Sequence, residues 1–180
     1  MSLIDFEDKA PRIDPDAFVA PGAQLIGDIV VGAEASIWYN CVLRGDMNRI
    51  RIGARSNLQD GTVIHVDPWR PGGPPEGFPC LIGEEVLIGH LAMVHGCTLH
   101  PHAFVGLGAI VMDGCVIEGD AMLAAGAMLT QGKRIPSGQL WAGRPARYVR
   151  DLRPEDVAGM RLGVAHYAEL ARQHREALSS

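Results

Sequence analysis

Three histidines, His65, His90 and His95, are the residues of this 180-residue chain whose type and spacing are best suited to chemistry. Neutral imidazole is a common ligand for zinc and other transition metals. Gln59 and Asp60 precede the first histidine and add polar side chains that could orient a ligand or a bound water. Whether these five residues meet depends on the elements that position them.

Those elements follow from a six-residue repeat of large apolar residues. The residue two positions before each large apolar residue is usually Ala, Cys, Ser or Thr, which matches the two-residue alternation of a strand. A hexad cannot bury its apolar residue alone, so hexads must stack on one another. Eighteen positions carry the repeat: Val19, Leu25, Val31, Ile37, Leu43, Ile52, Leu58, Ile64, Ile82, Ile88, Val94, Leu99, Val105, Val111, Ile117, Leu123, Leu129 and Ile135.

Three hexads per coil make a triangular prism, so the repeat predicts a mainly β fold, a parallel β-helix of about six coils. We place it in residues 1–150, with a protruding loop rich in Pro and Gly at 66–80. From Pro154 to Leu178, apolar residues recur every three or four positions. This spacing predicts an α-helix within 151–180, packed on the β-helix or on a neighbouring subunit.

The same count assigns the polar residues to faces of the prism. Arg44, His65 and His95 each follow a hexad residue of one face, so they should form a column on adjacent coils about 4.8 Å apart. His90 falls on the preceding face, one coil above Asp60, too far away to share an ion with the other two histidines. A second copy of the chain could supply its own His90, and three-fold symmetry would close the ring. The geometry therefore predicts a metal between subunits of a homotrimer.

From spacing alone, a second interpretation stays open. A surface histidine is usually just solvated, and the repeat could bring two of them into register by chance. The remaining histidines lack comparable partners, and we expect ordinary surface or packing roles for His100, His102, His166 and His174.

Composition excludes several classes of partner. The net charge of -5 supplies no basic surface for nucleic acid or for an anionic membrane. No apolar run approaches the roughly 20 residues of a membrane helix, and the N-terminus does not resemble a signal peptide. The four cysteines form no Cys-x-x-Cys pair and occupy the small inward positions of the repeat. We therefore expect reduced core thiols and a cytoplasmic location.

The motifs resemble those of the gamma-class carbonic anhydrases. The resemblance rests on Arg44-Gly45-Asp46, on the run from Asn57 through Gln59-Asp60 to His65, on Ile88-Gly89-His90 and on Val94-His95-Gly96. It implies a left-handed β-helix, a homotrimer, and zinc, with iron or cobalt as alternatives, held by His65 and His95 of one chain and His90 of the next. It also implies that Arg44 and Asp46 form a structural pair at the interface, and that Gln59 hydrogen-bonds a metal-bound water.

Such a site is suited to the reversible hydration of carbon dioxide to bicarbonate. Three neutral imidazoles leave the ion its full charge, so bound water becomes hydroxide near neutral pH. Gln59 could orient that hydroxide, and Asp60 could steady His90. One departure concerns proton transfer, because Met47 stands where archetypal members carry a glutamate, and the loop offers only Asp67 and Glu76.

Other functions are compatible with the same residues. A weak carbonic anhydrase-like protein could act on another substrate, and a structural or assembly subunit could keep the site without activity. A hexapeptide-repeat acyltransferase is the strongest rival, because Gly143-Arg144-Pro145-Ala146 resembles the ending of those proteins too. Those enzymes use a histidine as a general base without a metal, so a metal assay separates the two.

Overall fold

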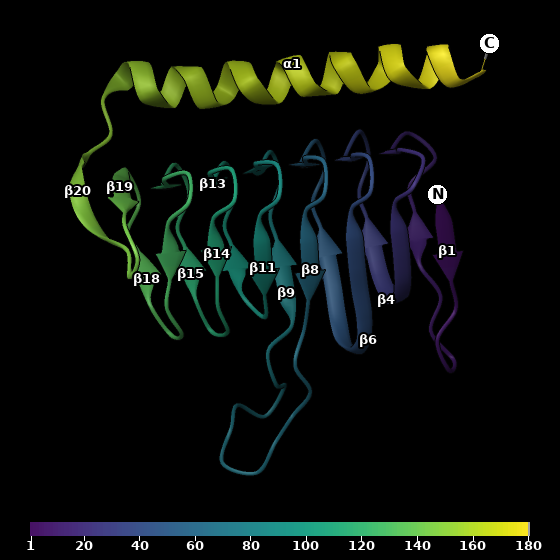
Figure 1. The fold of residues 1–180 in the computed structure, drawn as a ribbon, viewed down its shortest axis with the longest axis horizontal. Helices are drawn as coiled ribbons and strands as arrows, with labels where there is room; N and C mark the ends of the chain where they lie inside the picture. Colours follow the sequence, from purple (N-terminus) through teal and green to yellow (C-terminus); the bar gives the residue numbers. More distant parts are fainter. Residues whose placement is uncertain (180) are drawn as a thin grey trace.

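The hexads stack into a parallel β-helix in a computed structural model, which describes residues 1–179 of the chain. Its strands form three columns that run the length of the molecule (Figure 1). The prediction of a mainly β solenoid with one C-terminal helix is confirmed. Ser180, the last residue of the predicted segment 151–180, lies outside the described residues.

Each column contains parallel strands from successive coils. The first contains β1 (Ser2–Ile4), the starts of β4 (Gln24–Val31) and β6 (Val42–Ile52), β8 (Val63–His65), β11 (Met93–His95), β14 (Ile110–Val111) and β17 (Met128–Leu129). The second contains β3 (Phe18–Val19), β5 (Ser36–Ile37), β7 (Asn57–Leu58), β10 (Leu87–Ile88), β13 (Phe104–Val105), β16 (Met122–Leu123) and β19 (Gln139–Ala142).

The third column contains β2 (Arg12–Ile13), the ends of β4 and β6, β9 (Cys80–Ile82), β12 (Thr98–Leu99), β15 (Val116–Ile117) and β18 (Arg134–Ile135). The final strand, β20 (Arg147–Asp151), pairs antiparallel with β19. The solenoid is therefore longer than the six coils predicted. The added strands β1, β2 and β19 lie at its two ends. Ile13 of β2 and Trp141 of β19 keep the six-residue spacing to Val19 and Ile135.

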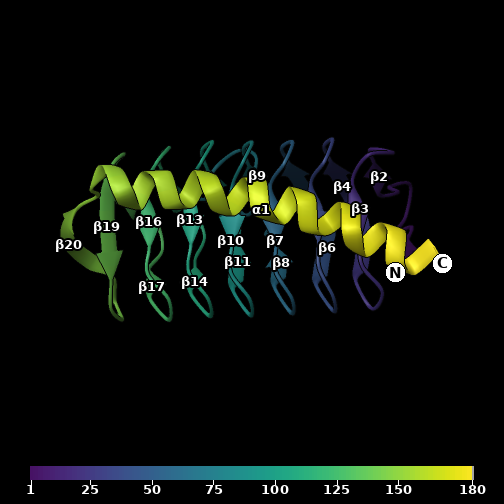
Figure 2. The same ribbon diagram turned by 90° about the horizontal axis from the view of Figure 1, so that it is seen from above.

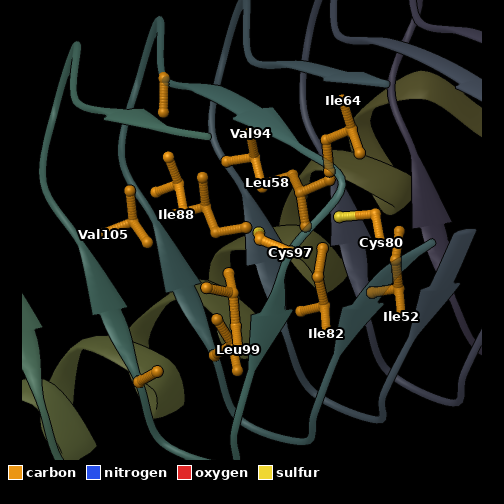
Figure 3. Packing of buried hydrophobic residues seen from close by; sticks show 14 of the residues in the cluster. Ile52, Leu58, Ile64, Cys80, Ile82, Ile88, Val94, Cys97, Leu99 and Val105 are labelled. Atoms are coloured by element: carbon orange, nitrogen blue, oxygen red, sulfur yellow. The ribbon is translucent and has the colours of Figure 1, made fainter. Parts of the chain in front are cut away.

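The inward residues of the hexads form one continuous core. Ile64 and Val94 are fully buried (Figure 3). The small positions before them hold Thr62 and Ala92, which are also buried. Burying one such large side chain contributes about 2–3 kcal/mol. Ordering the backbone of six residues costs more, about 1–2 kcal/mol per residue. Stacking is thus what makes a single hexad stable.

The α-helix α1 (Pro154–Ser179) lies along the second column and runs back toward the N-terminal end of the solenoid (Figures 1 and 2). Its start is fixed by Asp156, which accepts a hydrogen bond from the backbone N–H of Arg153 at 2.8 Å. Hydrogen bonds from Arg153 and Arg150 hold the pKa of Asp156 well below its usual value. Within residues 1–179, no helix combines the length and apolar character needed to cross a membrane.

An aromatic cluster anchors the far half of α1. Trp38 on the solenoid meets Tyr167 and His174 of the helix, with ring centroids 5.5 and 5.0 Å away. Phe18 packs against Trp38 from the next coil, and the hydroxyl of Tyr39 lies 2.9 Å from Nδ1 of His174. This packing holds the helix over the second column and so shapes one wall of the groove described below.

A long loop leaves the solenoid between β8 and β9 (Figure 1). The amide nitrogen of Asn48 closes its neck by donating to the carbonyls of Asp67 and Glu76, at 2.9 and 2.7 Å. At the end of the loop, Phe78 packs beside Gly96 of the solenoid. Trp69, within the loop, is exposed.

Candidate metal centre

Arg44, His65 and His95 lie side by side on neighbouring coils of the first column. The register pairs Arg44 with His65 and His65 with His95. The column predicted from the hexad count is therefore confirmed. Since Leu43, Ile64 and Val94 point into the core, the next residue of each strand must point outward.

The two imidazoles of this column face each other through one nitrogen each. Nδ1 of His65 lies 2.9 Å from Nε2 of His95. The other nitrogens face carboxylates: Nε2 of His65 lies 3.1 Å from Oδ1 of Asp46, and Nδ1 of His95 lies 2.5 Å from Oδ1 of Asp113. Because an ionised carboxylate only accepts hydrogen bonds, both outer nitrogens must carry a proton.

In the neutral form of each ring, the inner nitrogen then carries a lone pair, and the two lone pairs point at each other. Burial lowers the pKa of His65, helped by Arg44 and His95, and outweighs the opposing effect of Asp46. His65 is therefore held as the neutral imidazole, the form that binds metals. When both rings are neutral, their facing lone pairs repel each other, and a shared cation relieves this repulsion. The donor set thus fits a metal such as zinc, which takes neutral histidine nitrogens.

Asp46 connects this pair to Arg44. Nη1 of Arg44 donates to Oδ2 of Asp46 at 2.5 Å, and the backbone N–H of Met47 donates to Oδ1 at 2.9 Å. Although partial burial opposes the change, the hydrogen bonds from Arg44 and His65 lower the pKa of Asp46. Asp46 is therefore a fixed carboxylate that orients His65, with Arg44 compensating its charge.

His90 lies on another part of the surface, beside Asp60. Nδ1 of His90 is 2.8 Å from Oδ2 of Asp60, so the carboxylate holds the proton on Nδ1 and leaves Nε2 as the free nitrogen. The backbone N–H of His90 donates to Oε1 of Gln59 at 3.2 Å. Gln59 in turn donates from Nε2 to Oδ1 of Asn57 at 3.3 Å. These contacts hold His90 in one orientation at the corner of the prism.

His90 does not complete a site with the two histidines of its own chain. In residues 1–179, no three His, Cys, Asp or Glu side chains come together as a group able to hold one metal ion. His90 instead borders a groove of about 570 Å³ between the second column and α1. Gln59, Leu107, Met122 and Tyr167 also line this groove.

Asp113 is the member of the cluster that sequence reasoning missed. It follows the hexad residue Val111 by two positions, and the register places it one coil beyond Gly96. A side chain on Gly96 would fill the space that Asp113 uses, since an added Cβ would lie 2.3 Å from Oδ1. The available signal was a glycine directly after His95 with an aspartate at the same register position on the next coil.

The acidic residues of the loop lie in ion pairs. Asp67 pairs with Arg70 at 3.1 Å, and Glu76 pairs with Arg49 at 2.5 Å. Met47 is exposed beside Asp46. Arg144, in the motif shared with acyltransferases, donates to the carbonyls of Gly126 and Gly108, which gives this motif a structural role at the end of the solenoid.

Fold and site together define a hexapeptide-repeat β-helix protein with a surface pair of histidines fixed by carboxylates. No family model matches the chain. It is 46% identical over 173 residues to gamma carbonic anhydrase 2, mitochondrial, of Arabidopsis thaliana, which covers 96% of this chain and 62% of that protein. The chain thus spans about 62% of the length of this protein and of gamma carbonic anhydrase 1, mitochondrial, of the same plant.

Two solved structures match this chain over nearly their whole length. A hexapeptide transferase family protein from Anaplasma phagocytophilum is 43% identical, with a TM-score of 0.88, and the match covers 95% of this chain and 96% of that one. A Bacillus cereus protein described provisionally as an acetyltransferase is 34% identical, with a TM-score of 0.92 and 97% of both chains covered. The chain belongs to the gamma carbonic anhydrase-like family of hexapeptide-repeat β-helix proteins.

Proposed function

We propose that this chain forms a homotrimer that binds zinc at its three interfaces and catalyses the reversible hydration of carbon dioxide. One observation carries the proposal: the facing nitrogens of His65 and His95 lie 2.9 Å apart, while Asp46 and Asp113 contact the nitrogens on the opposite sides of the two rings. Zinc bound there would supply a nucleophile at neutral pH by lowering the pKa of water toward about 7.

The third ligand in this proposal is His90 of a second copy. Its Nε2 faces away from Asp60 and is available, and a cyclic trimer would present it three times to three equivalent histidine pairs. The names of the plant relatives support the activity, and the separation of His90 from His65 and His95 in one chain supports the shared site.

The remaining residues hold these ligands in place. Asp46 orients His65, and Asp60 orients His90. Gln59 keeps the backbone of His90 in position through its Oε1, and it lines the groove that His90 borders. A second lone pair on the same oxygen remains available to orient a water or a substrate at the edge of the site.

The proposal is tested by metal content and turnover measured on the same preparation. Elemental analysis should find one zinc per chain, sedimentation should give a trimer, and stopped-flow assays should show hydration above the uncatalysed rate. His95→Ala should lose zinc and activity. The matched control His100→Ala changes an exposed histidine near Glu118 and should keep both. A trimer without zinc, or activity that survives His95→Ala, would contradict the proposal.

The rival functions predict different results in the same assays. An acyltransferase needs an acyl donor and a histidine base, and complete removal of metal would leave its activity unchanged. The similar proteins from Anaplasma phagocytophilum and Bacillus cereus are both named as transferases, and metal removal separates that activity from zinc-dependent hydration. Zinc binding with hydration at the background rate would indicate an assembly subunit or another substrate.

The proposal places the protein in a reducing compartment such as the cytoplasm. All four cysteines are free and buried in the structure. Free thiols persist where glutathione and thioredoxin keep them reduced. The test is cell fractionation with an antibody against the chain, and recovery in an oxidising compartment would contradict it.

A further inference from the structure

We propose that Asp113 is a positioning residue that fixes His95 in the tautomer that binds metal. The consequence for metal affinity rests on the proposed function, whereas the tautomer itself is a property of the metal-free chain. The contact is short, with Oδ1 of Asp113 2.5 Å from Nδ1 of His95. Charge-assisted hydrogen bonds to a carboxylate are stronger than neutral ones.

The fold provides the space for this contact. Asp113 lies in the turn after β14, one coil beyond the turn after His95. Gly96 occupies the position between them and has a φ of +48°, in the left-handed region that favours glycine. A Cβ there would lie 2.3 Å from Oδ1 of Asp113 and 2.6 Å from Cβ of Phe78. Because Gly96 has no side chain, the carboxylate of Asp113 can contact the imidazole of His95.

The two carboxylates of the cluster differ in charge balance. Asp46 is compensated by Arg44, whereas Asp113 forms no ion pair with an arginine or lysine in the part of the chain that the structure describes. Its negative charge therefore acts on His95 without compensation. It favours the Nδ1–H form and makes the opposite nitrogen, Nε2, a better donor to a metal.

Without Asp113, the other tautomer of His95 becomes favourable. A proton on Nε2 of His95 would form a hydrogen bond to Nδ1 of His65, which lies 2.9 Å away. That bond would relieve the repulsion between the two lone pairs, and it would block both nitrogens for metal binding. Asp113 thus prevents a hydrogen bond from Nε2 of His95 to Nδ1 of His65.

The tautomer can be measured directly in metal-free protein. Solid-state NMR of histidine labelled with ¹⁵N distinguishes protonated from unprotonated ring nitrogens, and His95→Gln identifies the signals of His95. We expect the Nδ1–H form in the wild type and a shift to the Nε2–H form in Asp113→Ala. Asp113→Asn keeps the shape and a neutral acceptor, so it should give a mixture of the two forms.

Asp120→Asn is the matched control, because it removes the same charge from a turn residue that binds Arg161 instead of a histidine. It should keep the wild-type spectrum. Zinc affinity, measured by competition with a chelator, should fall about 10–100-fold in Asp113→Ala, less in Asp113→Asn and not in Asp120→Asn.

The outcomes separate the two proposals. Spectra of His95 that are the same in the wild type and in both Asp113 variants would overturn the role of Asp113. A wild-type chain that binds no zinc would overturn the proposed function and leave the tautomer result to decide the role of Asp113. If Asp113→Ala fails to fold, the comparison of Asp113→Asn with Asp120→Asn decides it.

Discussion

Nδ1 of His65 lies 2.9 Å from Nε2 of His95, on adjacent coils whose backbones are paired residue for residue. Each ring is turned so that its other nitrogen faces a carboxylate. A parallel β-helix is well suited to this arrangement, because its coils repeat about every 4.8 Å and place equivalent outward side chains in contact. In the proposed trimer, this pair forms one half of the metal site, and His90 of a second copy forms the other half.

Gln59→Ala tests the residue that holds the His90 turn. The substitution removes the acceptor of the backbone N–H of His90, so we expect the trimer to persist and carbon dioxide hydration to fall at least tenfold, about 1.4 kcal/mol. Stopped-flow rates should be compared with those of Gln24→Ala, which changes a glutamine in β4 that donates to the carbonyl of Gly22. Equal rates in the two variants would remove Gln59 from the mechanism.

Gly96→Ala tests the space between His95 and Asp113. Both this variant and Gly126→Ala place alanine at a positive φ, which costs about 1 kcal/mol. No atom lies within 4 Å of the added Cβ at Gly126, whereas the Cβ at Gly96 clashes with Asp113 and Phe78. Denaturant unfolding should therefore show a further loss of about 1–3 kcal/mol for Gly96→Ala. Equal stabilities would show that Asp113 moves freely.

The cysteines are predicted to be unreactive in the folded protein. Burial raises the pKa of the Cys41 thiol to about 11. Two effects raise the pKa of the Cys97 thiol: the larger is its hydrogen bond with Cys80, and the second is burial. Since the thiolate is the reactive form, labelling at pH 8 should be slow in the native state and should reach four thiols per chain in denaturant. Rapid labelling of two or more thiols before unfolding would contradict this placement.

The sequence predicted the parts of the structure that depend on the six-residue period. Arg44, His65 and His95 align because each follows a core residue by one position, and strand alternation then decides which way they point. His90 and Asp60 meet because each lies two positions after a core residue, and these core residues, Ile88 and Leu58, are paired on adjacent coils. Period alone was sufficient because adjacent coils of a solenoid differ mainly by a translation along its axis.

Features that depend on side-chain reach were not predictable in this way. Asp113 contacts His95 on the neighbouring coil only because Gly96 has no side chain in the way. The six-residue repeat does not indicate which turn residue makes such a contact with the next coil. At the start of the solenoid, Phe6 and Lys9 pair across a turn that interrupts the period between β1 and β2. At its end, Trp141 keeps the six-residue spacing and the parallel pairing with Leu123, but its aromatic side chain differs from the Val, Leu and Ile of the other hexads.

Complementation between two inactive variants is the measurement that tests the shared site most directly. One variant carries His90→Ala, and the other carries both His65→Ala and His95→Ala, so each homotrimer lacks every complete site. The two are unfolded, mixed equally and refolded, and mass spectrometry confirms mixed trimers. In a cyclic trimer with random mixing, roughly a quarter of all sites regain both halves and should bind zinc tightly. Mixed trimers that bind no zinc would contradict a site shared between subunits.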